Sequence, residues 1–143
     1  MKKHLLSIAA CVLLASSAYA IDAAWTKTLL HYTVYGSGTS ATTTFTPPTT
    51  VPSSTTSITS VTYAWNPYPN GNTSELVLLC YTQPYGTNVY RCVDVTANRT
   101  RTLNDFNTLS ARGSFSLKHT LTGGTYPATA SGVSDTVTVN YSF

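Results

Sequence analysis

Apolar and polar residues alternate with a period of two along much of this chain. This pattern is typical of β-strands that bury one face, because successive side chains of a strand point to opposite sides. The clearest case ends the chain, where Val137, Val139 and Tyr141 alternate with polar residues. No segment shows the sustained three-to-four-residue spacing of an amphipathic helix. The pattern therefore predicts an all-β protein.

Turn residues separate the expected strands. We expect strands at about 26–35, 58–65, 75–82, 89–96, 112–121 and 135–143, short strand pieces near Phe45, and apolar anchors at Leu103 and Phe106 within the polar segment 98–107. Turns are predicted where Gly, Pro and Asn gather, as at 67–72 and 123–124. The Ser, Thr and Pro residues of 37–57 favour a loop or an extended edge. About seven strands with intervening turns predict a single antiparallel β-sandwich.

The first twenty residues have the three parts of a secretory signal peptide. Two lysines precede an apolar run at 5–14, and small residues then lead to an Ala-x-Ala motif that ends at Ala20. We expect cleavage after Ala20, which leaves one exported domain of residues 21–143 in the periplasm. The alternative is lipoprotein processing at Cys11. The apolar run is too short to span a bilayer, and no later segment is apolar enough to do so.

Two cysteines remain after such cleavage, Cys80 and Cys92. A lone pair of cysteines in an oxidising compartment predicts one disulfide. The pair falls on neighbouring predicted strands that flank a turn at 84–86, so the two side chains can meet if they lie opposite each other. The alternative is two free buried thiols. A bridge that closes a loop of this size would stabilise the fold by about 3 kcal/mol in the chain-entropy model.

Charged residues are scarce. The chain has eight Lys and Arg residues and five Asp and Glu residues, and two of the lysines fall in the predicted signal peptide. Six basic against five acidic residues give the mature chain a formal net charge of +1. This near-neutral balance disfavours nucleic-acid binding, which needs clustered basic residues. It also disfavours strong binding to an anionic membrane surface.

The sequence offers no constellation of residues typical of catalysis. Two histidines remain in the mature chain, His31 and His119, and no serine lies in a nucleophile-elbow pattern. The acids show no acid/base pairing by spacing, and they are Asp22, Glu75, Asp94, Asp105 and Asp135. His119 lies on the apolar face of its strand, which favours a hydrogen-bonded core or rim histidine over a metal ligand. We therefore expect a non-enzymatic protein with no metal and no cofactor.

Tyr and Trp residues gather around two predicted turns. The candidates for a binding surface are Tyr63, Trp65, Tyr68, Tyr81, Tyr85 and Tyr90. Such side chains are large, rigid and amphipathic, and they suit protein interfaces and sugar stacking. The alternative is that alternate tyrosines pack the sheet and keep their hydroxyl groups in water.

Several short motifs, taken in order, resemble the bacterial flagellar protein family FlhE. The matching elements are Ala24-Trp25, the strand at 58–65, LVLLC at 76–80, RCVDV at 91–95, Thr102 with Phe106, LSARGSF at 109–115, Gly123-Gly124, Pro127 and VTVNY at 137–141. These elements extend over nearly all of the mature chain. The positions that carry the family pattern most clearly are Trp25, Arg91, Phe106, Gly124, Asn140 and Tyr141.

The resemblance implies a periplasmic, non-enzymatic accessory protein of the flagellum. Members of the family are linked to swarming, to flagellar export and to guarding the export apparatus against proton leakage, with chaperone-like behaviour. The implied partner is a protein of the flagellar basal body or export apparatus. A small, neutral sandwich with exposed sheet edges could hold an extended partner by strand addition.

Two other functions remain open on the sequence. The last strand resembles that of fimbrial pilins, which are structural subunits; a pilin should also carry an N-terminal donor strand, and 21–28 does not clearly show one. The aromatic residues would also suit a carbohydrate-binding β-sandwich module.

Overall fold

The computed structural model describes residues 20–129 and 131–143. Apart from Ala20, the expected signal peptide of residues 1–20 lies outside the described residues, and so does the alternative processing site at Cys11. Within the described part of the chain, no helix is long and apolar enough to cross a membrane.

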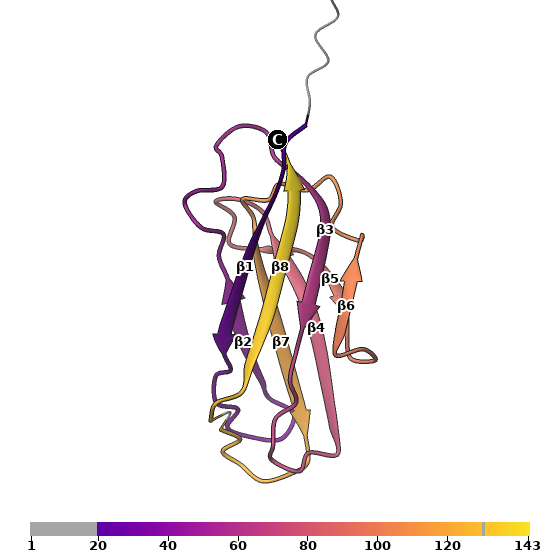
Figure 1. The fold of residues 1–143 in the computed structure, drawn as a ribbon. Helices are drawn as coiled ribbons and strands as arrows, with labels where there is room; N and C mark the ends of the chain where they lie inside the picture. The colour runs from indigo at the N-terminus through magenta and orange to yellow at the C-terminus, as the bar shows by residue number, and fades with distance from the viewer. Residues whose placement is uncertain (1–19, 130) are drawn as a thin grey trace, which may run out of the picture.

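The described residues form eight antiparallel strands in two four-stranded sheets that pack face to face (Figure 1). The strands are β1 Asp22–Leu30, β2 Ser40–Phe45, β3 Ser57–Ala64, β4 Ser74–Thr82, β5 Val89–Asp94, β6 Thr100–Leu103, β7 Ser114–Thr122 and β8 Ser134–Ser142. One sheet has the order β1-β8-β3-β6, and the other has the order β2-β7-β4-β5. The predicted all-β antiparallel sandwich is confirmed.

The strongest alternation in the sequence lies on β7 and β8, two of the four strands that the structure places inside the sheets. Every second residue of β8 is buried, from Asp135 to Tyr141, and β7 follows the same pattern. β8 pairs with β1 on one side and with β3 on the other. Threonines face each other across the outer side of this sheet, where Thr26 and Thr138 share a hydrogen bond of 2.8 Å. Such cross-strand pairs stabilise the pairing of the strands.

Two strand predictions differ from the structure. The first strand was expected at 26–35, but β1 begins at Asp22 and ends at Leu30. β1 ends at Leu30 because that residue pairs with Ser134, the first residue of its antiparallel partner β8, and no β8 residue remains to pair with the next position. The segment 98–107 was expected to supply only two anchors, yet 100–103 forms the short edge strand β6 against the end of β3. Four largely exposed residues carry too little alternation to reveal a strand.

The core between the sheets is rich in aromatic side chains. Phe106 and Phe115 pack edge to face with ring centroids 5.1 Å apart, and Tyr81 packs against Phe115 at 5.2 Å. Leu103 is also buried, so both expected anchors of segment 98–107 are confirmed.

The disulfide between Cys80 and Cys92 is present, as predicted. The two residues lie directly opposite each other on β4 and β5. This placement joins the edge strand β5 covalently to a strand inside its sheet. A disulfide fits an oxidising compartment.

Candidate functional site

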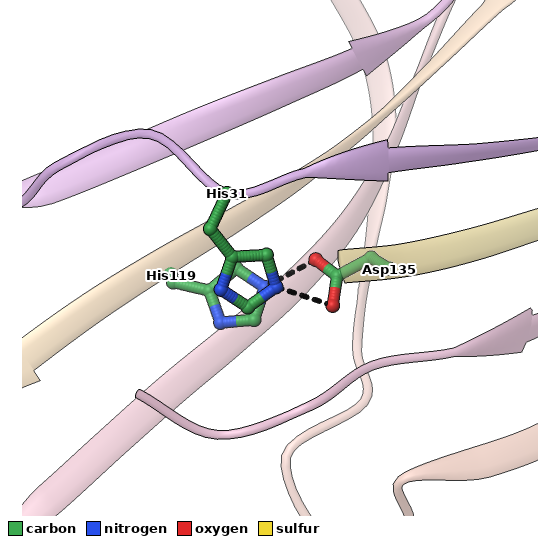
Figure 2. A group of neighbouring side chains, drawn as sticks. All are labelled: His31, His119 and Asp135. Atoms are coloured by element: carbon green, nitrogen blue, oxygen red, sulfur yellow. Dashed lines mark hydrogen bonds and ion pairs between the residues drawn. The ribbon is translucent and has the colours of Figure 1, made fainter. Parts of the chain in front are cut away.

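Four ionisable side chains meet in the interior near one end of the sandwich. His31 directly follows β1 and Asp135 is the second residue of β8, so both are positioned by one sheet. Glu75 is the second residue of β4 and His119 lies in β7, so both belong to the other sheet. Figure 2 shows the two imidazole rings one above the other, with the Asp135 carboxylate facing the same edge of both. We call these four residues the histidine–carboxylate cluster.

Short hydrogen bonds connect the members of the cluster. His31 Nε2 lies 2.6 Å from Asp135 Oδ1, and His119 Nε2 lies 2.8 Å from Asp135 Oδ2. The other ring nitrogen of His119, Nδ1, lies 2.6 Å from Glu75 Oε1. The side chains of His31 and Asp135 have no exposed surface, and those of His119 and Glu75 are only 2% and 7% exposed. The polar atoms of these four side chains therefore contact one another and have almost no contact with solvent.

Both ring nitrogens of His119 have a carboxylate neighbour, which bears on its protonation. An ionised carboxylate can only accept hydrogen bonds, and both ring nitrogens of His119 face carboxylates. These neighbours therefore favour the form of His119 that carries hydrogen on both nitrogens. Burial alone lowers the pKa of His119, but the bonds to Asp135 and Glu75 outweigh burial and raise it. Burial likewise raises the pKa of Asp135, and the bonds from both histidines outweigh it and lower that pKa.

Aromatic rings from the connection between β3 and β4 close over the cluster. The ring of Tyr68 lies against His31 with centroids 4.8 Å apart, and Trp65 meets His119 edge-on at 5.9 Å. The Tyr68 hydroxyl donates to the carbonyl oxygen of Tyr32 at 2.5 Å, which fixes the ring in place. These contacts exclude solvent from the histidines.

Backbone groups of the same connection complete the carboxylate contacts. The Asn66 N–H donates to Asp135 Oδ1 at 3.0 Å, and the Tyr68 N–H donates to Glu75 Oε2 at 3.2 Å. Hydrogen bonds to the charged form of a carboxylate favour that form. The connection therefore packs against the cluster and also supplies a backbone hydrogen bond to each carboxylate.

The prediction of a hydrogen-bonded core histidine at His119 is confirmed. Spacing along the sequence shows no acid/base pairing among the acids, and the structure brings Glu75 and Asp135 together on the two ring nitrogens of His119. Spacing could not reveal this, since the residues lie on different strands. One signal was available: Glu75, His119 and Asp135 each occupy an inward position of an alternating strand, where a charged or polar residue needs a partner.

Histidine beside a carboxylate is an arrangement that can transfer protons in catalysis. Here no member of the cluster is open to solvent beyond a few per cent of its side chain. The rings of Tyr68 and Trp65, which are themselves buried, pack against its histidines. The arrangement therefore joins the two sheets through buried contacts.

The structure separates the six predicted binding aromatics into two groups. Tyr63, Trp65, Tyr68 and Tyr81 are buried. The hydroxyl of Tyr81 donates to the carbonyl oxygen of Ser110 at 2.9 Å, and burial raises the pKa of Tyr81 to about 12. The six residues thus form no common surface. Only Tyr85 and Tyr90, which are 90% and 54% exposed, remain available to a partner.

Three of the six family-pattern positions support the core. Trp25, Phe106 and Tyr141 are buried between the sheets. The indole N–H of Trp25 donates to the carbonyl oxygen of Ala111 at 3.2 Å. A buried Trp needs such a partner, so this pair fixes β1 against the segment that precedes β7.

The other three positions shape turns and surface contacts, and they are Arg91, Gly124 and Asn140. Gly124 has a φ of +82°, and a Cβ there would lie 2.6 Å from the carbonyl oxygen of Asn70, so only glycine fits. The Arg91 guanidinium donates to the carbonyl oxygen of Asp105. The Asn140 amide donates to the Ser60 hydroxyl at 2.9 Å. The six positions do not converge on one site.

Comparison with known proteins gives a match at the level of structure. No family model matches the chain, and no curated protein matches it in sequence. The crystal structure of FlhE matches with a TM-score of 0.63 and 20% sequence identity, over 84% of this chain and 96% of that chain. The fold is FlhE-like. The sequence resemblance to that family is thereby supported for the fold, and fold alone does not establish function.

Proposed function

We propose that this protein is a non-enzymatic, periplasmic accessory protein of the bacterial flagellum that acts as an FlhE-like protein. The observation that carries the proposal is the shared fold, which covers 84% of this chain and nearly all of the FlhE chain. The disulfide is consistent with an oxidising compartment such as the periplasm. The closed histidine–carboxylate cluster supports a role that does not involve catalysis.

The proposed role is to assist flagellar export and swarming and to limit proton leakage through the export apparatus. Chaperone-like binding of an exported or basal-body protein would serve this role. Such a partner would be a protein in an extended conformation, because sheet edges recognise extended segments by strand addition.

The edge strand β5 is the contact that we propose for this partner. It pairs with β4 on one side only, and nearly all of its residues are exposed. Val89 and Tyr90 on β5, together with Tyr85 in the preceding turn, are among the exposed large apolar residues. Edge strands with exposed apolar side chains favour pairing with another chain.

The two other candidate functions have less support. A donor-strand pilin needs an open position beside its last strand, whereas β8 is paired on both sides. A sugar-binding module needs a platform of exposed rings, and four of the six candidate rings are buried. Tyr85 and Tyr90 alone would have to supply that platform.

Deletion of the gene in its host tests the flagellar proposal. We expect reduced swarming and increased proton leakage into the cytoplasm, both restored by the wild-type gene on a plasmid. Unchanged motility and unchanged leakage, or a host without flagella, would contradict the proposal.

A pair of matched variants tests the proposed contact. The double variant Tyr85→Ser/Tyr90→Ser should fold normally, because both rings are exposed, and should fail to restore swarming. The control is Tyr32→Ser/Tyr35→Ser, which removes two other exposed tyrosines that are 64% and 81% exposed. Full complementation by the first variant would rule out this surface while leaving the flagellar role open.

A further inference from the structure

Three donor groups of the histidine–carboxylate cluster converge on one buried point. One ligand atom each from His31, His119 and Asp135 lie within 4.8 Å of one another, and all three residues are buried. Figure 2 shows both imidazole rings presenting Nε2 to the same carboxylate. The three residues come from the end of β1, from β7 and from β8, so the point lies between the two sheets.

The cluster combines two carboxylates with two imidazole rings in the interior of the sandwich. Both carboxylates have a histidine nitrogen within hydrogen-bond distance. In the described part of the chain, the ion pairs of Glu75 and Asp135 involve histidines and no Lys or Arg. An uncompensated buried charge is costly. A divalent cation held by neutral histidines would bring the net charge of the four groups to zero.

The surrounding contacts are those of a metal-binding histidine. Glu75 holds Nδ1 of His119 and so fixes the tautomer whose Nε2 points at the carboxylate. A metal-bound histidine almost always donates its second ring N–H to such a carboxylate or carbonyl partner. The carboxylate of Asp135 is itself oriented by the Asn66 N–H. His119 and Asp135 are therefore each oriented by a group that would not itself bind the metal.

The ring of His31 has fewer polar contacts than that of His119. Its side chain is fully buried, and among the described residues Nδ1 has no hydrogen-bond partner, so the ring is held by the bond from Nε2 to Asp135. A bond from Nε2 to a metal would hold this ring more firmly than one hydrogen bond to Asp135.

We propose that His31, His119 and Asp135 form a structural Zn²⁺ site. Two imidazole nitrogens and a carboxylate suit Zn²⁺, and a carboxylate that binds through both oxygens completes four donors. The site is closed to solvent, which is the character of a structural rather than a catalytic zinc site. Zinc–ligand distances of about 2.0–2.2 Å require the nitrogens and oxygens to separate by roughly half an ångström from their present hydrogen-bond distances.

Titration of the mature, chelator-treated protein with ZnCl₂ tests the proposal. Isothermal titration calorimetry at neutral pH should give one Zn²⁺ per chain, and Zn²⁺ should raise the melting temperature. Nitrogen-15 spectra of the imidazole rings should show Nε2 of both His31 and His119 shifting together at one equivalent. This spectroscopic readout uses the wild-type chain, so it does not depend on whether a variant folds. Absence of binding at millimolar Zn²⁺ would overturn the proposal and leave the cluster as a network held by protons.

Variants locate the site. Asp135→Asn should abolish stoichiometric binding, whereas Glu75→Gln keeps all three ligands and should weaken binding by about 10–100-fold. Asp105→Asn, which changes an exposed acid outside the cluster, is the matched control and should bind as the wild type does. Undiminished one-to-one binding by Asp135→Asn would also overturn the proposal, because the metal would then lie elsewhere. These measurements are independent of the proposed flagellar role.

Discussion

The two ends of the sandwich are stabilised in different ways. At one end, Tyr81, Phe106 and Phe115 pack between the sheets beside the disulfide. At the other end, the histidine–carboxylate cluster connects the sheets through hydrogen bonds of 2.6–2.8 Å. Apolar burial is non-directional and scales with area, whereas buried charges stabilise only when every partner is in place. The aromatic end should therefore be robust to changes in conditions, and the charged end should depend on each of its members.

The largest effect is expected at the aromatic end. Phe115→Ala removes a fully buried ring and should lower the free energy of unfolding by about 4 kcal/mol. Urea unfolding followed by fluorescence measures this. Phe143→Ala is the matched control, because that ring is 39% exposed, and it should cost much less. Equal losses for the two variants would show that the aromatic end does not dominate stability.

The disulfide should contribute the next largest effect. Cys80→Ser/Cys92→Ser opens the loop and should lower the free energy of unfolding by about 3 kcal/mol, because the unfolded chain gains conformational freedom. A reductant should destabilise the wild type by a similar amount and leave the double variant unchanged. A reductant effect on the double variant would point to a cause other than the bridge.

At the charged end, Glu75→Gln should lower the free energy of unfolding of the chelator-treated protein by about 2 kcal/mol. The change keeps the size of the side chain but replaces a charged acceptor of His119 by a neutral one. Urea unfolding in the presence of a chelator measures the loss. The exposed change Asp105→Asn should stay within about 0.5 kcal/mol of the wild type. A loss from Glu75→Gln above that from Phe115→Ala would reverse the comparison of the two ends.

The smallest effect on stability is expected from Asp94, an exposed acid outside the buried cluster. Hydrogen bonds from Thr96, including its N–H at 2.9 Å, lower the pKa of the exposed Asp94. A lowered pKa contributes stability above the ordinary pKa of Asp, and this contribution is lost as the pH falls through the lowered value. The melting temperature of Asp94→Asn should therefore lie slightly below that of the wild type at pH 7, and the difference should vanish at strongly acidic pH. A difference that grows in acid would contradict this sign.

Much of the fold could be predicted from local pattern. Alternation located β3, β4, β5, β7 and β8 to within a few residues, because one buried face imposes a period of two. The lone pair of cysteines predicted the bridge. The limits of β1 and the existence of β6 were missed, since a strand also needs a neighbour of matching length and neither neighbour is visible in local sequence.

The sequence by itself determined which way the key side chains face, and only the tertiary structure decided what they meet. Alternation places Glu75, His119 and Asp135 on inward positions of three strands. Whether inward acids find a partner depends on strand order and on how the two sheets pack. The alternation of residues along a strand gives no information about either. The same limit applies to the aromatics, because Tyr81 and Tyr90 lie on neighbouring strands yet one is buried and the other exposed. The sandwich is thus a property of local pattern, whereas the histidine–carboxylate cluster exists only through long-range contacts between the two sheets.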